Sequence, residues 1–188
     1  MAANWPLIER CNFDSNDGLW HYDLSAFYYL FEDEEIQDYR GALYEYDFEM
    51  QVCGAVRTPF DSGCQEGRGA ICGYNSTSNG TYLGELGSWS ILPQPVWSMA
   101  DPADPMIGAI LTYNNGVFLD RTEEVTVTVH LPCDPVVEVM AQDFELTETH
   151  MLDSFVVTMA ASKYACPQQI VQPALVGPIS AGSVFLAM

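Results

Sequence analysis

Six cysteines carry the clearest chemistry in this chain. They stand at positions 11, 53, 64, 72, 133 and 166, and no two of them form a Cys-x-x-Cys pair. That spacing disfavours a zinc site, whereas an even, dispersed set of cysteines is typical of disulfide bonds. Sequons at Asn75 and Asn79 agree, because they act only in a chain that enters the secretory pathway. We therefore predict disulfides, a sugar on Asn75 or Asn79, and a lumenal or extracellular location.

Residues suited to catalysis are sparse by comparison. His21, His130 and His150 are far apart in the sequence, which contains no G-x-S-x-G, H-E-x-x-H or P-loop pattern. His130 alternates with apolar residues, so we expect it on the polar face of a strand, at the surface. None of these residues indicates an enzyme.

Two acidic stretches each have two interpretations. Residues 14–18, DSNDG, have the composition of a calcium loop, but the glycine comes one position early and no glutamate closes the loop. A turn is the favoured interpretation. Residues 31–38, FEDEEIQD, are interpreted as a solvated loop, with a patch for a cation or a partner as the alternative.

The net charge excludes one class of partner. The 26 acidic and 6 basic residues give a formal charge of -20, which would repel the phosphates of a nucleic acid. Two roles for the charge remain open. It serves solubility, or it collects divalent cations or basic partners.

The elements that position these residues are predicted to be β-strands, because apolar residues recur with a period of two. The alternation is most regular over residues 44–52 and 125–131. Further short strands, separated by Gly, Pro, Asn and Asp, are expected at residues 26–31, 82–86, 96–99, 108–113, 135–140 and 155–159. No segment before the C-terminal tail has a helical stripe. The predicted fold class is all-β, a flattened barrel or sandwich of two antiparallel sheets.

The two ends of the chain carry expectations about the membrane. Residues 1–10 lack the apolar run of a signal peptide, so we expect the leader to be absent from this numbering. We expect one lumenal domain over residues 1–167 and a juxtamembrane segment over 168–188. The apolar, uncharged residues 176–188 are too few to cross a bilayer, which takes about 20. They begin a membrane helix, or they form a final buried strand.

Several motifs, taken in order, resemble one known family. A tyrosine-rich strand ends in cysteine (YEYDFEMQVCG, 44–54), and a glycine-rich strand–turn–strand segment bearing the sequons follows (GAICGYNSTSNGTYLGEL, 69–86). Next come an apolar strand with a glycine turn (GAILTYNNG, 108–116) and a β-branched strand ending in Cys-Asp (VTVTVHLPCD, 125–134). The last motif is an aromatic strand closing on A-C-P (FVVTMAASKYACP, 155–167). Over nearly its whole length the chain resembles the mannose 6-phosphate receptor homology (MRH) domain, most closely the cation-dependent receptor branch.

The resemblance implies a disulfide pairing and a tail. Cys11 would pair with Cys53 and Cys133 with Cys166, which leaves Cys64 and Cys72 to close a local loop. The motif S-x-G-S-x-F-L at residues 180–186 is similar to the family's entry into its membrane helix. The resemblance therefore implies a disulfide-stapled lumenal domain of a single-pass membrane protein.

The resemblance also implies where a sugar would bind. The family binds mannose with a glutamine, an arginine, a glutamate and a tyrosine. The glutamine position is Gly73, and Arg121 is the nearest arginine, offset by several residues. Glu145 fits the glutamate, and Phe155 or Val156 aligns with the tyrosine. The acid that holds a divalent cation in the receptor branch aligns loosely with Asp120.

Two functions follow from this degenerate site. Gly73 and Phe155 both lack the hydrogen-bonding groups of the family, so most of a weak sugar affinity should be lost. The preferred function is a non-enzymatic binding module that makes protein contacts in a membrane-associated assembly. The alternative is a lectin that sorts mannose-bearing or phosphomannosyl cargo glycoproteins in the endosomal–lysosomal pathway.

Overall fold

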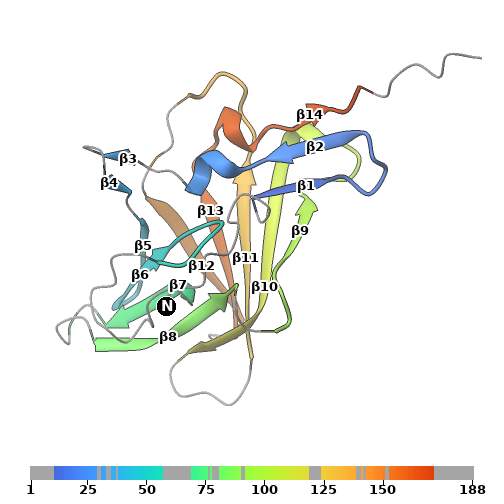
Figure 1. Ribbon diagram of the computed structural model, residues 1–188. Coiled ribbons are helices and arrows are strands. Elements are labelled where there is room, and N and C mark those ends of the chain that lie inside the picture. Colours follow the sequence, from blue (N-terminus) through green and yellow to red (C-terminus); the bar gives the residue numbers. More distant parts are fainter. Residues whose placement is uncertain are drawn as a thin grey trace, which may run out of the picture.

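Strands and short 3-10 turns make up the regular structure of the residues described below (Figure 1). The computed structural model describes residues 11–28, 31–32, 35–36, 38–56, 69–75, 77, 81–89, 92–118, 124–138, 141, 143–150 and 153–171. No helix within these ranges is long and apolar enough to cross a membrane. The all-β class predicted from the sequence is confirmed. Of the predicted juxtamembrane segment, residues 168–188, only residues 168–171 are described, and residues 172–188 lie outside the described residues.

Four antiparallel strands form one half of a nearly closed barrel. They are β5 (Tyr39–Leu43), β6 (Tyr46–Met50), β7 (Gly69–Asn75) and β8 (Thr81–Ser88). Alternate residues of a strand point to the same side, and the inward set here is apolar. Tyr39, Met50 and Ile71 lie opposite one another across β5, β6 and β7 and are fully buried. This inward face is one wall of the hydrophobic core.

The other half of the barrel contains a parallel pair. Its strands, in spatial order, are β10 (Gly108–Phe118), β11 (Val125–Pro132), β13 (Ser154–Met159) and β12 (Phe144–His150). β9 (Val96–Met99) pairs with β10 beside this path. β13 is antiparallel to β12 but parallel to β11.

The prediction of two antiparallel sheets is therefore wrong in its detail. The eight strands follow one path, β12-β13-β11-β10-β8-β7-β6-β5, and the sheet is mixed. β13 enters the space between β11 and β12, where strands pair with it on both sides. The inward residues Phe155, Val157 and Met159 are buried, so this central position is favoured by apolar burial.

The barrel closes where β5 meets β12. Arg40 of β5 forms a parallel bridge with Asp143, next to the start of β12. A Cβ atom built at Gly41 would lie 2.2 Å from Cε2 of Phe144. The Phe144 ring therefore lies directly on the backbone of β5, which only glycine permits at this distance. We call this contact between β5 and β12 the seam.

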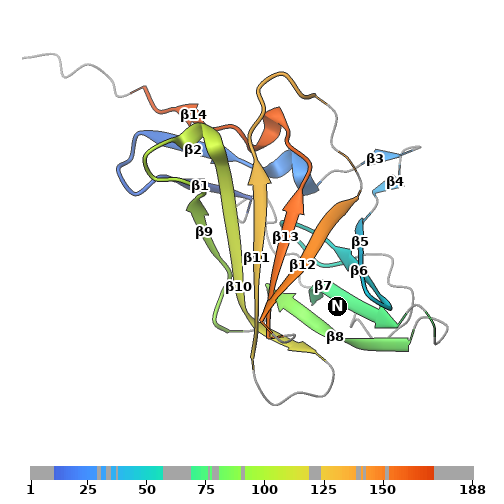
Figure 2. The ribbon, with the colours of Figure 1, turned by 180° about the vertical axis from the view of Figure 1, so that it is seen from behind.

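A small sheet lies across one end of the barrel, away from β7 and β8, as Figures 1 and 2 show from opposite sides. It consists of β1 (Asn12–Asp14), β2 (Trp20–Asp23) and β14 (Gln168–Gln169). The predicted turn at residues 14–18 joins β1 to β2, with Gly18 at a φ of 68°. The remaining elements are β3 (Phe31–Glu32) with β4 (Glu35–Ile36) and three 3-10 turns, η2 (Ser25–Tyr28), η3 (Pro105–Ile107) and η4 (Lys163–Ala165).

Two disulfides attach the small sheet to the barrel. Cys11, just before β1, is bonded to Cys53, just after β6. Cys133, just after β11, is bonded to Cys166, just before β14. Both pairs were predicted, and both are confirmed. Cys72 is also disulfide-bonded, and its predicted partner Cys64 lies outside the described residues.

Three of the predicted strand segments differ from the structure over part of their length. Residues 25–28 form η2, which buries Phe27 and Tyr28. Residues 44–45 form the hairpin turn between β5 and β6, with Tyr44 at a φ of 57°, so the strand predicted at 44–52 begins later. Residues 135–136 form a turn rather than a strand, where Asp134 accepts a hydrogen bond from the backbone N–H of Val136. Local turn chemistry overrides the apolar pattern in these segments.

A predicted turn is instead part of a long strand. Residues 114–116, Asn-Asn-Gly, continue β10 through a shift of register between Tyr113 and Gly116. The Asn115 side chain accepts from the Ser88 N–H at 3.0 Å and donates to the carbonyls of Ser88 and Pro93 at 2.7 and 2.9 Å. These three bonds hold the chain after β8 against β10, and they make a bulge out of the expected turn.

The outer face of β6 is buried although its residues are polar. Glu49 and Gln51 alternate with the inward residues of β6, and the sequence predicts them at the surface. They are 1% and 0% exposed. Gln51 donates to the buried Asp38 carboxylate at 2.8 Å, and the Arg40 Nε atom lies 3.9 Å from Glu49. Asp38, at the end of the predicted solvated acidic run, is thus part of a buried polar contact.

Candidate functional site

The predicted sugar position Gly73 lies inside the barrel. It is on the inward face of β7, in register with Phe48 of β6 and Gly84 of β8. A Cβ atom built at Gly73 would lie 2.6 Å from Cε2 of Phe118 and 3.0 Å from Cε1 of Phe48. The site therefore has no room for the glutamine side chain that the resemblance to the MRH domain implies here.

Aromatic rings fill the space in front of Gly73. Phe155, the second predicted sugar residue, is fully buried, with its ring centroid 6.0 Å from that of Phe118 and 6.4 Å from that of Phe48. The Phe48 and Phe118 centroids are 5.9 Å apart. Edge-to-face and tilted pairs at these distances are favourable packing. We call Phe48, Phe118 and Phe155 the aromatic plug.

Glu145 does not join Gly73 and Phe155. It alternates along β12 with Phe144 and Leu146, which are buried, whereas Glu145 is exposed. A strand places successive side chains on opposite faces, so Glu145 lies outside the barrel. The structure thus brings two of the predicted sugar positions together and separates the third from them. Val156, the other tyrosine candidate, is half-buried and alternates with the inward Phe155.

Glu148 is an acidic residue that the sequence reasoning missed. It is the register partner of Phe155 across β12 and β13, and directly paired residues of antiparallel strands lie on the same face. It is half-buried. Counting alternate residues from Phe144 and Leu146 would have placed Glu148 on the inward face. An acid therefore borders the aromatic plug, three positions away from the one predicted.

The predicted arginine and cation ligand are not described. Arg121 and Asp120 lie outside the described residues, between the end of β10 at Phe118 and the start of β11 at Val125. Among the residues that the structure does describe, no three His, Cys, Asp or Glu side chains are grouped so as to hold a metal ion. The divalent cation site at Asp120 stays a prediction.

One of the two sequons is described. Asn75 ends β7, and its side-chain oxygen accepts bonds from the Thr77 N–H at 2.9 Å and the Thr77 hydroxyl at 2.7 Å. Asn79 lies outside the described residues. The Asn75 sequon thus lies at the end of a strand, where the Thr77 hydroxyl contacts the Asn75 side-chain amide. Glycosylation at Asn75 or Asn79 stays a prediction.

An open groove runs along the seam. It encloses about 500 Å³ and is lined mainly by β12, the end of β13 and Ala42 of β5. Glu145 and Asp143 supply carboxylates, and Thr158 supplies a hydroxyl. These groups accept hydrogen bonds, but they lack a nucleophile with a neighbouring base. We call this depression the seam groove.

A second, smaller cavity lies between the β1–β2 hairpin and β9. It encloses about 300 Å³. One wall contains Phe13 and Trp97, whose rings are stacked with an interplanar angle of 5° and centroids 5.7 Å apart. The other wall is the turn after β1, with Asp14 and Asp17. We call it the hairpin cavity.

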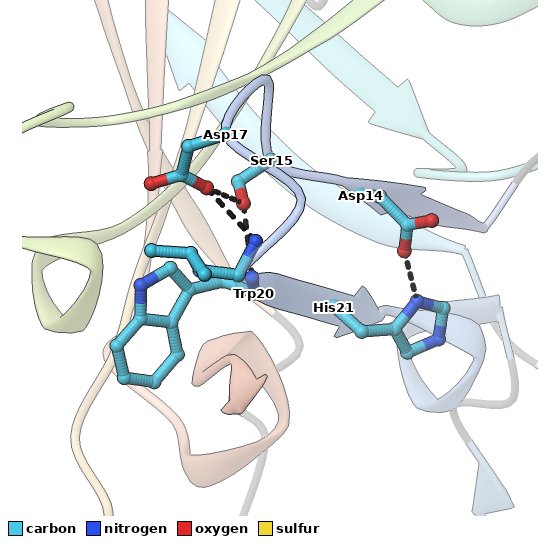
Figure 3. A network of polar contacts seen from close by, with 6 residues as sticks. Asp14, Ser15, Asp17, Trp20 and His21 are labelled. Atoms are coloured by element: carbon cyan, nitrogen blue, oxygen red, sulfur yellow. Dashed lines mark hydrogen bonds and ion pairs between the residues drawn. The ribbon is translucent and has the colours of Figure 1, made fainter. Parts of the chain in front are cut away.

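The turn beside the hairpin cavity is held by its own hydrogen bonds, which Figure 3 shows. The Ser15 hydroxyl donates to the Asp17 carboxylate and accepts from the Trp20 N–H at 2.9 Å. The same Asp17 oxygen accepts from the Leu19 N–H at 3.0 Å. The Asp14 carboxylate lies 2.7 Å from Nδ1 of His21. The carboxylates therefore have fixed positions.

The Ser15 hydroxyl, and next the Leu19 N–H, hold the pKa of Asp17 below its usual value. Hydrogen bonds to a carboxylate stabilise its charged form. Asp17 is therefore ionised throughout the pH range of secretory compartments and the cell exterior. None of the described residues that line the hairpin cavity is Lys or Arg.

No protein-family model and no curated protein sequence matches this chain. The class of protein therefore rests on its own geometry, which is a disulfide-bonded, nearly closed mixed β-barrel with a small sheet across one end. Disulfides of this kind are typical of an oxidising extracellular or lumenal environment.

Proposed function

We propose that the chain is a non-enzymatic binding module of the MRH type. Its barrel no longer binds mannose, and its surface contacts proteins. It works in the lumen of the secretory or endosomal pathway or at the cell surface. The observation that carries the proposal is the aromatic plug. Three buried rings occupy the space in front of Gly73, where the family places a hydrogen-bonding side chain.

The energetics favour loss of sugar binding. A sugar ring presents hydroxyl groups that need donors and acceptors, and each unmatched polar group costs about 1–3 kcal/mol. The plug offers ring carbons, and Glu145 lies on the other side of the sheet. Displacing the rings would also open an unfavourable cavity. These terms together exceed the affinity of a weak lectin.

Protein contacts are favoured by the surface. A formal charge of -20 attracts basic segments and accelerates their association. Two depressions lined by described residues, the seam groove and the hairpin cavity, are both acidic. A basic protein partner therefore fits the surface better than a neutral sugar does.

Calorimetric titration with mannose and mannose 6-phosphate, with and without Mn²⁺, tests the loss of sugar binding. We expect no saturable heat at about 1 mM sugar. The dissociation constant would then exceed about 1 mM, which corresponds to a favourable binding free energy of less than about 4 kcal/mol. A glycan array extends the test to larger sugars. A saturable site that Glu148→Gln or Glu145→Gln abolishes would overturn the proposal in favour of a sorting lectin.

We further propose that the chain belongs to a single-pass membrane protein. The support is the sequence of residues 176–188, which is apolar and uncharged. These residues lie outside the described ones. Fractionation of the native protein tests this: we expect it in the membrane pellet, resistant to carbonate extraction. Recovery in the soluble fraction would contradict membrane attachment and leave the binding module intact.

A further inference from the structure

The hairpin cavity combines an aromatic wall with fixed carboxylates. Tyr22, Phe13 and Trp97 form a stack in that order, with centroid separations of 4.5 and 5.7 Å and nearly parallel planes. Tyr22 is fully buried, whereas Trp97 is half-buried and lines the cavity. The buried end anchors the stack, so the aromatic wall keeps its position without a ligand.

The carboxylate wall is equally well fixed. Besides the side-chain bonds of the turn, the Ser15 N–H donates to the Trp20 carbonyl at 2.8 Å and the Gly18 N–H donates to the Ser15 carbonyl at 2.8 Å. Both donors to Asp17 meet the same carboxylate oxygen. In Figure 3 the other oxygen of Asp17 points away from them. That oxygen is positioned to accept from a ligand at little cost in conformational entropy.

The chemistry of these walls selects a planar cation. Phe13 lies between Tyr22 and Trp97 in the stack, so Trp97 is the ring of this wall that a cation would stack on. The negative face of an aromatic ring attracts a cation, most strongly for Trp, and a carboxylate attracts its charge and accepts its N–H groups. A guanidinium group satisfies both, because it stacks flat on aromatic rings and presents several donors in one plane. A neutral sugar would leave the ionised Asp17 without charge compensation.

We propose that the hairpin cavity binds the arginine side chain of a basic segment in a protein partner. The inference rests on the proposed function in that it names the chemistry of the partner and the place where it docks. The Asp17 carboxylate gives the complementary charge, whereas Asp14 at the same wall is bonded to His21. The cavity of about 300 Å³ accommodates one side chain. The segment around the arginine lies along β9 and the turn after β1.

NMR titration of the disulfide-bonded chain tests the docking site. The probe is the peptide Ac-Gly-Ser-Arg-Ser-Gly-amide in about 0.15 M salt, which screens long-range attraction. The matched control peptide replaces arginine with citrulline, which has nearly the same shape but no charge. We expect saturable shifts at the amides of Asp17, Ser98 and Met99, and an affinity for citrulline about tenfold lower.

Variants assign the binding to the two walls. Trp97→Ala and the milder Asp17→Asn should each lower the affinity for the arginine peptide about fivefold or more, with melting temperatures recorded in parallel. Glu124→Gln, at an exposed position just before β11 and outside both depressions, removes one negative charge elsewhere and should leave the affinity unchanged.

Three results would overturn the inference. Equal affinity for arginine and citrulline would exclude charge recognition. An equal loss in Glu124→Gln and Asp17→Asn would mean general electrostatic attraction without a site. Shifts of the same amides with mannotriose in place of the peptide would identify a sugar site. Failure of the arginine peptide to bind leaves the sugar titrations of the barrel interior unaffected, so the two proposals fail separately.

Discussion

Gly73 determines which side chains can pack inside the barrel, because it has no side chain of its own. Its missing Cβ lets the rings of Phe48 and Phe118 approach the backbone of β7, and Phe155 completes the packing. Interior packing is as dense as in organic crystals, so even one added methylene is felt. The glycine and the plug therefore depend on each other, and a single substitution cannot introduce a glutamine here without disturbing the plug.

Replacing Gly73 with Gln should destabilise the chain without creating sugar affinity. The added Cβ would lie 2.6 Å from Phe118, and a buried amide adds the cost of an unmatched polar group. We expect a loss of about 2–4 kcal/mol in the free energy of unfolding. Urea denaturation measures it, with Thr158→Gln on the exposed face of β13 as control. A stable Gly73→Gln variant that binds mannose would contradict the aromatic plug.

Tyr22 gives a prediction about alkaline pH. Burial raises its pKa to about 12, and the carboxylates of Asp104 and Asp17 add to the shift. In the unfolded chain tyrosine titrates near pH 10. Between about pH 10 and about pH 12 the unfolded state therefore releases a proton that the folded state keeps. The contribution of the Tyr22 hydroxyl to the free energy of unfolding is complete below pH 10 and is lost as the pH rises towards 12.

We expect Tyr22→Phe to lose less of its unfolding free energy than the parent chain across that interval. The substitution removes the hydroxyl that donates to the Pro105 carbonyl at 2.9 Å, so its stability at pH 7 should be lower by about 1 kcal/mol. Denaturation midpoints at several pH values measure both effects. Identical alkaline slopes in the two proteins would show that Tyr22 does not cause the effect.

The seam between β5 and β12 is the feature that decides barrel closure at the level of elements. The described strands pair continuously from β12 through to β5, and the two end strands meet over Gly41 and Phe144. Closing the barrel covers sheet edges that would otherwise offer backbone groups to another chain. The contact between Gly41 and the Phe144 ring therefore keeps the edges of two whole strands covered.

Gly41→Val should open the seam. The Phe144 ring must move, because a Cβ at this position would lie 2.2 Å from Cε2 of Phe144. We expect a loss of about 1–3 kcal/mol of stability and a tendency to associate through the exposed edges. Denaturation and light scattering measure the two effects.

The neighbouring Ala42→Val on the exposed face is the matched control. The double variant with Phe144→Leu should recover part of the loss. Equal stabilities of Gly41→Val and Ala42→Val would contradict the seam contact.

At the scale of the whole molecule, the disulfides decide whether the small sheet stays attached to the barrel. Cys11 leads into β1 and is bonded to the chain after β6, while Cys166 leads into β14 and is bonded to the chain after β11. The two outer strands of the three-stranded sheet are thus each fastened next to a barrel strand. The hairpin cavity lies between this sheet and β9, so its shape depends on both bridges.

Removing the Cys133–Cys166 bridge by a double substitution to alanine should cost about 2–4 kcal/mol of unfolding free energy. The bridge spans 33 residues, and its loss restores chain entropy to the unfolded state. Amide exchange should accelerate most in β2 and least in β7, because β14 loses its attachment. Unchanged exchange in β2 would show that the small sheet is held by packing alone. The matching alanine pair at Cys11 and Cys53, 42 residues apart, serves as comparison.

The sequence by itself determined the strand class and the faces of the regular strands, and its cysteines and sequons predicted an oxidising environment. Alternation with a period of two is set by residues i and i+2, so β11 and β13 were readable from their valines and phenylalanine. The resemblance supplied the two described disulfide pairs. The turn at residues 14–18 was readable because Asp, Asn and Gly carry local turn chemistry.

Only the tertiary structure decided which strands are neighbours and which polar residues are buried. The parallel pairing of β13 with β11, the buried Glu49 and Gln51, and the position of Glu148 beside Phe155 all depend on contacts between distant segments. The hairpin cavity joins a turn near residue 15 to β9, far along the chain. The local periodicity of a strand sets the directions of its side chains, but the packing of the whole core determines which strands pair with it.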